Sequence, residues 1–232
     1  SIRKRKIVLP NILKSKFGPF IVLGIAILFY CIPLFLGYAW NTIAPGAGPP
    51  NIYTQPESYL GRYANGYLSI DTPTPPTYNL PYDVRLHRYL LGGHIPLWNP
   101  DQALGIPFSA QGEGSPYFPL QILRSVLPQI YANYVTFLGF YVAGIFLFLF
   151  LKDTGVSDIA SYIGSFSFVL SGALGAMIPV TNVVSSLSVV PFLFWAVARA
   201  VRLKTPFWRS LLSFAVAAQI LAGHAQMTFV IL

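Results

Sequence analysis

The sequence contains apolar runs that are long enough to cross a lipid bilayer, and this feature limits the fold more than any other. About 20 helical residues span the roughly 30 Å of hydrocarbon. Four runs reach or approach this length, at 17–40, 131–151, 159–178 and 183–201. A fifth run begins near Leu211 and is still apolar at Leu232. Hydrophobic residues make up 54% of the chain and charged residues only 9%, which is typical of a membrane protein.

We therefore predict an all-α polytopic membrane protein with about five transmembrane helices. The predicted parts are a basic N-terminus at 1–16, a first transmembrane helix at 17–40, a large loop at 41–130, and helices two to five within 131–232, the last of them truncated. No polar or basic flank closes the fifth run, so we expect this sequence to be the N-terminal portion of a longer protein. The single cysteine, Cys31, excludes an intrachain disulfide and a cysteine metal site.

The basic residues predict the orientation, because membrane proteins concentrate Lys and Arg in their cytoplasmic loops. Six basic residues precede the first run, and Lys152 follows the second. The stretch between the fourth and fifth runs carries Arg199, Arg202, Lys204 and Arg209. Placing each cluster in the cytoplasm puts the N-terminus inside and the loop 41–130 outside, together with five of the seven acids. This distribution accounts for the formal net charge of +8 without a nucleic-acid partner.

The loop 41–130 is rich in proline and tyrosine, which predicts an ordered cap on the membrane surface. Fourteen of the twenty prolines lie in it, and its aromatic content argues against disorder. Two short interfacial helices are expected, one in "PYDVRLHRYLLGGH" and one at 119–127. In the first helix we expect Asp83, Arg85, His87 and Arg88 to face water or headgroups. In the second we expect Arg124 to meet lipid phosphate.

Two motifs resemble a known family. The stretch "GGHIPLWNPDQALGIPFSAQGEGSPYFPLQIL" at 92–123 resembles the "G-x-x-PLWNP... G-x-P... YP-L" signature of the bacterial YfhO-like membrane proteins. The stretch "LAGHAQMTFVIL" at 221–232 resembles the "GHPQ" helix of that family, with Ala225 in place of the usual proline. The similarity extends over about 68–232.

YfhO-like proteins are similar to the GT-C superfamily of polytopic glycosyltransferases. The resemblance implies a GT-C-like fold in the cytoplasmic (inner) membrane of a prokaryote. It also implies a polyprenyl-phosphate-linked sugar as donor, an extracytoplasmic acceptor, and an acid in the first external loop that acts near the acceptor. Membrane lipids and the polyprenyl-phosphate sugar are the expected partners. A divalent cation is the one cofactor that remains open.

Asp71 is the candidate catalytic base. It stands before the Pro-rich run "TPTPP", where the resemblance places the first-loop acid of GT-C proteins, and a turn or cap role is the alternative. Glu113 is the second catalytic candidate, because it lies in a Gly-rich bend that is able to approach a ligand. We expect Asp83 to face solvent and Asp101 to bond turn amides beside Pro100.

Four other residues are candidates for substrate binding: Arg88, Arg124, His224 and Gln226. The last two are polar groups in an apolar run, which favours a functional role, but a buried histidine that bonds a neighbouring helix fits equally well. The three histidines, His87, His94 and His224, match no zinc-binding spacing, so no metal site is assigned.

The segment with Pro96, Trp98, Asn99 and Pro100 is predicted to be structural rather than catalytic. Asn99 precedes a proline and is held extended, and Trp98 is expected to fill a small core. The small residues within 161–175 favour close helix packing over a pore lining. The alternative to an enzyme is a non-catalytic polytopic subunit that packs against protein subunits of a larger membrane complex.

Overall fold

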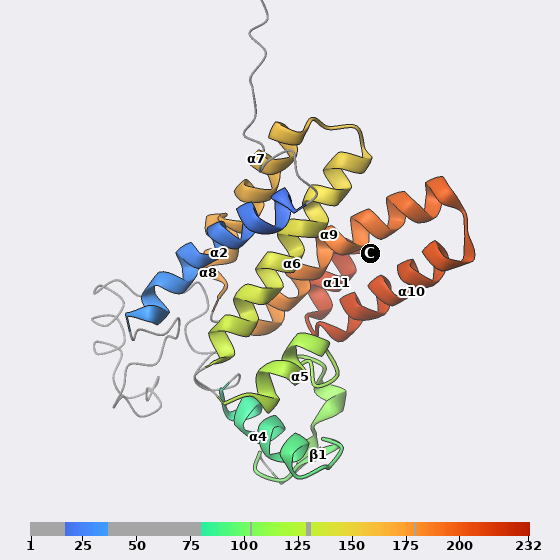
Figure 1. The fold of residues 1–232 in the computed structure, drawn as a ribbon. Coiled ribbons are helices and arrows are strands. Elements are labelled where there is room, and N and C mark those ends of the chain that lie inside the picture. Colours follow the sequence, from blue (N-terminus) through green and yellow to red (C-terminus); the bar gives the residue numbers. More distant parts are fainter. Residues whose placement is uncertain (1–16, 37–79, 103, 129–130, 179) are drawn as a thin grey trace, which may run out of the picture.

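The computed structural model describes residues 17–36, 80–102, 104–128, 131–178 and 180–232, and most of these residues are helical (Figure 1). Seven helices form a bundle: α2 (Gly18–Phe35), α6 (Ala132–Asp153), α7 (Asp158–Val169), α8 (Gly172–Ala176), α9 (Thr181–Leu203), α10 (Pro206–Leu221) and α11 (Ala225–Ile231). A smaller part, here called the cap, lies at one end of the bundle. It contains α4 (Leu80–Leu91), β1 (Trp98–Asn99), β2 (Ile106–Pro107), the 3-10 turn η2 (Ser109–Gln111) and α5 (Pro119–Val126).

Three helices within the described residues are long and apolar enough to cross a membrane, namely α2, α6 and α9. They contain 18, 22 and 23 residues, with mean hydropathies of 2.3, 2.2 and 1.7. At 1.5 Å per residue each is about 27–35 Å long, which matches the hydrocarbon thickness. The prediction of an all-α membrane-embedded protein is confirmed at this level, and the count of five spans stays a prediction.

The predicted span 159–178 is not one continuous helix. Helix α7 ends at Val169, and α8 begins only at Gly172. Ser171 is the N-cap of α8, and its hydroxyl accepts a hydrogen bond from the Leu174 N–H at 3.3 Å. Serine favours this position because its side chain satisfies a backbone donor that has no helical partner. Hydropathy alone does not detect such a break.

The predicted fifth run is also divided. Helix α10 begins earlier than expected, with Pro206 in its first turn, and ends at Leu221. Gly223 then adopts a φ of +83°, which favours glycine and ends helices. His224 is the N-cap of α11, and its Nδ1 accepts a hydrogen bond from the Met227 N–H at 3.2 Å. His224 therefore lies at a helix break rather than within a continuous span.

Contacts between the helices give their relative directions. Helices α2 and α6 run antiparallel, because the Tyr141 hydroxyl donates to the Phe20 carbonyl while Phe35 lies near Tyr134. Helices α6 and α9 run in the same direction. Gly139 faces Ser188 near the cap, and at the other ends of the same helices Asp153 contacts Arg199. The basic residues around Lys152 and those around Lys204 thus lie at the same end of the bundle, away from the cap.

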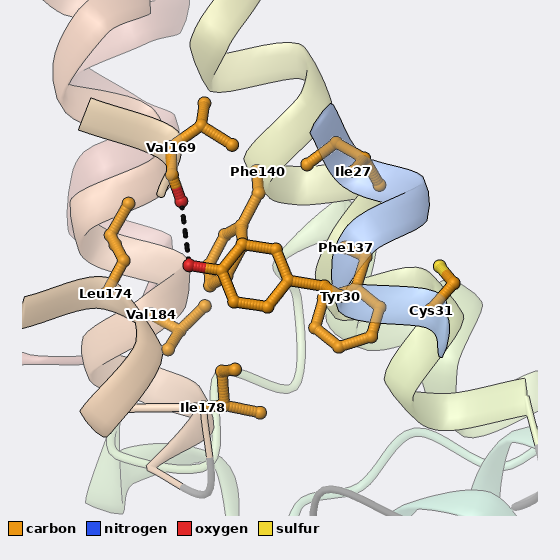
Figure 2. Close-up of a cluster of buried hydrophobic side chains, with 9 residues drawn as sticks. All are labelled: Ile27, Tyr30, Cys31, Phe137, Phe140, Val169, Leu174, Ile178 and Val184. Carbon is orange, nitrogen blue, oxygen red and sulfur yellow. Dashed lines mark hydrogen bonds between the residues drawn. The ribbon is translucent and has the colours of Figure 1, made fainter. Parts of the chain in front are cut away.

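A cluster of buried side chains joins α2 to α6, α7, α8 and α9 (Figure 2). Tyr30 of α2 is central to it, because its ring stacks on Phe137 at 5.5 Å between centroids and its hydroxyl donates to the Val169 carbonyl at 3.1 Å. Phe137 and Phe140 are fully buried. This hydrogen bond satisfies the last turn of α7 just before the helix breaks.

At the other end of the bundle, Asp153 ties α6 to α9. Arg199 donates to both carboxylate oxygens of Asp153, with its Nη2 at 2.7 Å from Oδ1, and the Trp195 indole N–H donates to Oδ2 at 2.9 Å. The Arg199 guanidinium also lies over the rings of Trp195 and Trp208. One of the basic residues that predicted topology thus has a structural role as well.

The cap has a small aromatic core. Tyr82, Leu86 and Phe108 are buried together, and the rings of Tyr82 and Phe108 stack at 4.0 Å between centroids. Tyr89 also packs against Phe108. These contacts hold α4 against the segment that follows β2.

Trp98 does not fill that core, contrary to prediction. Its side chain is 51% exposed, and its ring lies over Gly105, where an added Cβ would be 2.6 Å from the indole nitrogen. In the β1–β2 ladder Trp98 pairs with Pro107, so the next residue, Phe108, takes the buried position instead. The side chain of Asn99 accepts a hydrogen bond from the Asp101 N–H at 3.1 Å, a turn geometry that Asn commonly adopts.

Candidate functional site

A buried ion pair joins the two helices of the cap. Asp83 of α4 is only 4% exposed, and its Oδ2 lies 2.9 Å from Nη2 of Arg124 in α5. The side-chain amide of Gln121 donates to Asp83 Oδ1 at 2.6 Å. One turn further along α4, His87 Nδ1 donates to the Ser125 carbonyl at 2.6 Å. The polar face of α4 is therefore packed against the polar face of α5.

This arrangement corrects one prediction. Asp83 does not face solvent. Arg124 pairs with it through Nη2, and the predicted contact of Arg124 with lipid phosphate stays a prediction. The physical reason for the correction is that a buried carboxylate requires a cation and hydrogen-bond donors, and Arg124 and Gln121 supply them. Burial raises the pKa of Asp83, whereas the Arg124 charge and the Gln121 amide each lower it; burial is the largest effect, so the pKa lies above the ordinary value.

Directly beside the ion pair is a pocket between α5, α6 and α9. Its polar lining comes from all three helices and consists of Gln121, Arg124, Thr136, Thr181, Ser185 and Ser188. Its volume is about 20 Å³, which is room for about one water-sized group. Gly139 also lines it, and a Cβ there would be 3.0 Å from Leu120. The glycine at this position therefore allows α5 to lie close to α6.

Two hydrogen-bond donors of this pocket lack partners within the described part of the chain. They are Arg124 Nε and Ser188 Oγ, and both atoms are buried. Arg124 therefore pairs with Asp83 through Nη2 and leaves its Nε–H without an acceptor. Unsatisfied buried donors are costly, so the arrangement is suited to hold a small group that accepts hydrogen bonds.

The Gly-rich bend that contains Glu113 meets the break between α10 and α11. Ser115, at a φ of +53°, donates from its hydroxyl to the Ala222 carbonyl at 2.7 Å. A Cβ on Gly223 would be 2.2 Å from Ser115 Oγ and 2.5 Å from the Gly112 carbonyl oxygen. The two motif segments, separated by about a hundred residues in sequence, thus contact each other where Gly223 leaves no room for a Cβ.

The predicted site residues do not gather at one place within the described part of the chain. Asp71 lies outside the described residues. Glu113 is exposed on the bend, and Arg88 and Gln226 are exposed on α4 and α11. His224 is half-buried and caps α11. Of the four predicted binding residues, Arg124 alone lines the pocket.

Within the described ranges no group of three or more His, Cys, Asp or Glu side chains is placed to hold a metal ion. A divalent cation as cofactor stays a prediction, because Asp71 is not among those residues. The ion pair of Arg85 with Asp101, at 2.8 Å, gives Asp101 a partner other than the turn amides.

No family model, curated protein or solved structure matches the chain. The resemblance to YfhO-like proteins therefore rests on the sequence motifs alone.

Sequence reasoning missed Thr181, Ser185 and Ser188. The stretch "TNVVSSLSVV" carries these three hydroxyls at helical spacings of four and three residues within an apolar run. Such spacing places them on one face of a helix, and this was the available signal. Their meeting with Arg124 depends on how α5 packs across α9, which spacing does not reveal.

Proposed function

We propose that this chain is the N-terminal part of a membrane glycosyltransferase that moves a sugar from a polyprenyl-phosphate donor to an extracytoplasmic acceptor. The observation that carries the proposal is the contact between the two motif segments, through Ser115 and Ala222. Segments that define a family by sequence and also meet in space are expected to build one shared region. The polar pocket beside Arg124 lies on the same side of the bundle.

The proposed location is the cytoplasmic membrane of a prokaryote, with the cap outside. The chemistry requires a base, because an acceptor hydroxyl is a poor nucleophile at neutral pH. Asp71 is the proposed base, and Glu113 is the alternative because it is exposed on the bend that contacts α10 and α11. Arg88, Arg124, His224 and Gln226 are the proposed substrate-binding residues.

The test uses the full-length protein purified from its native membrane. Mass spectrometry of copurified lipids should find a sugar-linked polyprenyl phosphate. Asp71→Asn should slow transfer by roughly 100-fold or more and should raise the amount of donor that copurifies, because binding persists without turnover. The matched control is Asp158→Asn, which removes a half-exposed carboxylate paired with Lys152 at the other end of the bundle.

Three results would decide against parts of the proposal. Normal transfer by Asp71→Asn eliminates that residue, and loss in Glu113→Gln instead moves the role there. Absence of any polyprenyl-linked sugar, together with copurifying membrane proteins in fixed ratio, supports the non-catalytic subunit. That alternative has an observation in its favour, because Phe229 and Val230 of α11 are 88% and 80% exposed and offer an apolar surface for another helix.

A further inference from the structure

We propose that the pocket between α5, α6 and α9 binds a phosphate oxygen of a lipid headgroup. The proposal concerns binding alone, so it does not depend on whether the complete protein transfers a sugar. Its residues are Arg124, Ser185, Ser188 and Thr181, of which three were not predicted to bind anything.

The side chains that line the pocket favour binding of an anionic group that accepts hydrogen bonds. Arg124 Nε and Ser188 Oγ are buried donors without partners among the described residues, and Ser188 is only 7% exposed. Asp83, the carboxylate that pairs with Arg124 through Nη2, does not line the pocket. An oxygen that enters the pocket therefore meets donors rather than a competing acid.

Helix α9 adds a favourable field. Thr181 is its first residue, and Ser185 and Ser188 continue the same face over the next two turns. The preceding residue, Val180, makes no side-chain cap. The positive end of a 23-residue helix therefore lies at the pocket, where it stabilises negative charge.

The position of the pocket indicates that the phosphate belongs to a lipid. Its walls are the first turns of α6 and α9, which are two of the candidate membrane spans, and the ends of spans lie at headgroup depth. Helix α5, which forms one wall of the pocket, directs Ile122, Leu123 and Val126 outward, so its outer face is apolar. At about 20 Å³ the pocket admits one oxygen of a phosphate but not a sugar ring.

The experiment compares binding by the full chain in nanodiscs of a neutral lipid that lacks phosphate. Native mass spectrometry measures retention of three probes: a polyprenyl phosphate, phosphatidylglycerol and inorganic phosphate. Ser188→Ala should weaken retention of a lipid probe about tenfold or more, because a hydrogen bond to a charged group is lost. Ser186→Ala is the matched control, since Ser186 is a fully buried, unpartnered hydroxyl on the same helix that does not line the pocket.

A second variant keeps the proposal testable if the cap is sensitive to mutation. Arg124→Lys retains a positive charge opposite Asp83 but lacks the Nε–H, and lysine does not replace a forked donor. It should weaken retention while the cap stays folded.

Selective retention of either lipid supports the proposal and identifies the source, polyprenyl phosphate or phospholipid. The proposal is overturned if only inorganic phosphate is retained, because the lipid assignment then fails. Equal retention by Ser188→Ala and Ser186→Ala also overturns it and indicates that the pocket holds water. Loss of sugar transfer with intact lipid retention would instead refute the proposed function and leave this site standing.

Discussion

Breaking the Asp83–Arg124 pair from one side should detach the cap helices from each other. Asp83→Asn keeps the shape of the side chain and an oxygen that accepts from Gln121, but it leaves the Arg124 guanidinium, 14% exposed, without its counter-charge. Arg124→Met keeps the apolar stem and leaves the Asp83 carboxylate alone. Each single change therefore strands one buried charge.

The magnitude follows from the geometry of the pair. At 2.9 Å and an effective dielectric constant near 20, the attraction is about 6 kcal/mol before desolvation is subtracted. Removing one partner of a buried pair costs about 3–5 kcal/mol. The double variant Asp83→Asn/Arg124→Met strands neither charge, so its cost should be well below the sum of the single costs.

Hydrogen exchange of the α4 amides in nanodiscs measures this directly, because local opening of the cap exposes them. A cost of 3–5 kcal/mol corresponds to exchange that is faster by about two to four decades. Additive effects of the two substitutions would refute the reasoning, since a coupled pair must show a large interaction energy in the cycle. Exchange in α9 should change little and serves as the internal control.

The same Arg124→Met variant predicts a pH dependence. Burial raises the pKa of Asp83 above its ordinary value, and loss of the arginine removes the main opposing effect. The folded state then binds a proton more tightly than the unfolded state, so stability is greatest at low pH and falls as the pH rises through the folded pKa. The destabilisation should therefore be smaller near pH 5 than near pH 8. The opposite slope would mean that the carboxylate is not buried.

Two further predictions concern packing and topology. Phe108→Ala should destabilise the cap by about 3–5 kcal/mol, because Phe108 is fully buried, whereas Trp98→Ala should cost less than half as much; equal losses of thermal stability would contradict the observed burial. In a Cys31→Ser background, a cysteine at Gln102 should react with an impermeant thiol reagent in intact cells and one at Thr205 should not, and the reverse labelling pattern would invert the proposed orientation.

Hydropathy predicted the three long helices because a helix that crosses lipid needs a long apolar run, and such a run is visible in the sequence. The starts of α2 and α6 lie within one residue of the predicted starts, and α9 begins two residues early. The breaks at Ser171 and Gly223 were missed because window averages do not register a single capping serine or a glycine at positive φ. Asp71 and the other residues of 37–79 lie outside the described part, so their predicted roles are untested.

The cap shows why polar patterning alone misled. The prediction assumed that the apolar sides of the two cap helices lie at the membrane interface and that their charges face water or headgroups. In α5 the polar side is buried in the protein instead: Gln121 and Ser125 are buried while Ile122 and Val126 are exposed, which inverts the pattern of a helix in a soluble protein. Its polar face packs against α4 and the pocket, and its apolar face turns outward.

This inversion is what a lipid environment favours. Hydrocarbon accepts exposed apolar side chains without cost, whereas polar groups in it must find partners inside the protein. The buried pair of Asp83 and Arg124 and the apolar outer face of α5 are therefore two results of the same physical rule. The apolar outer face of α5 is therefore the face that we expect to meet lipid.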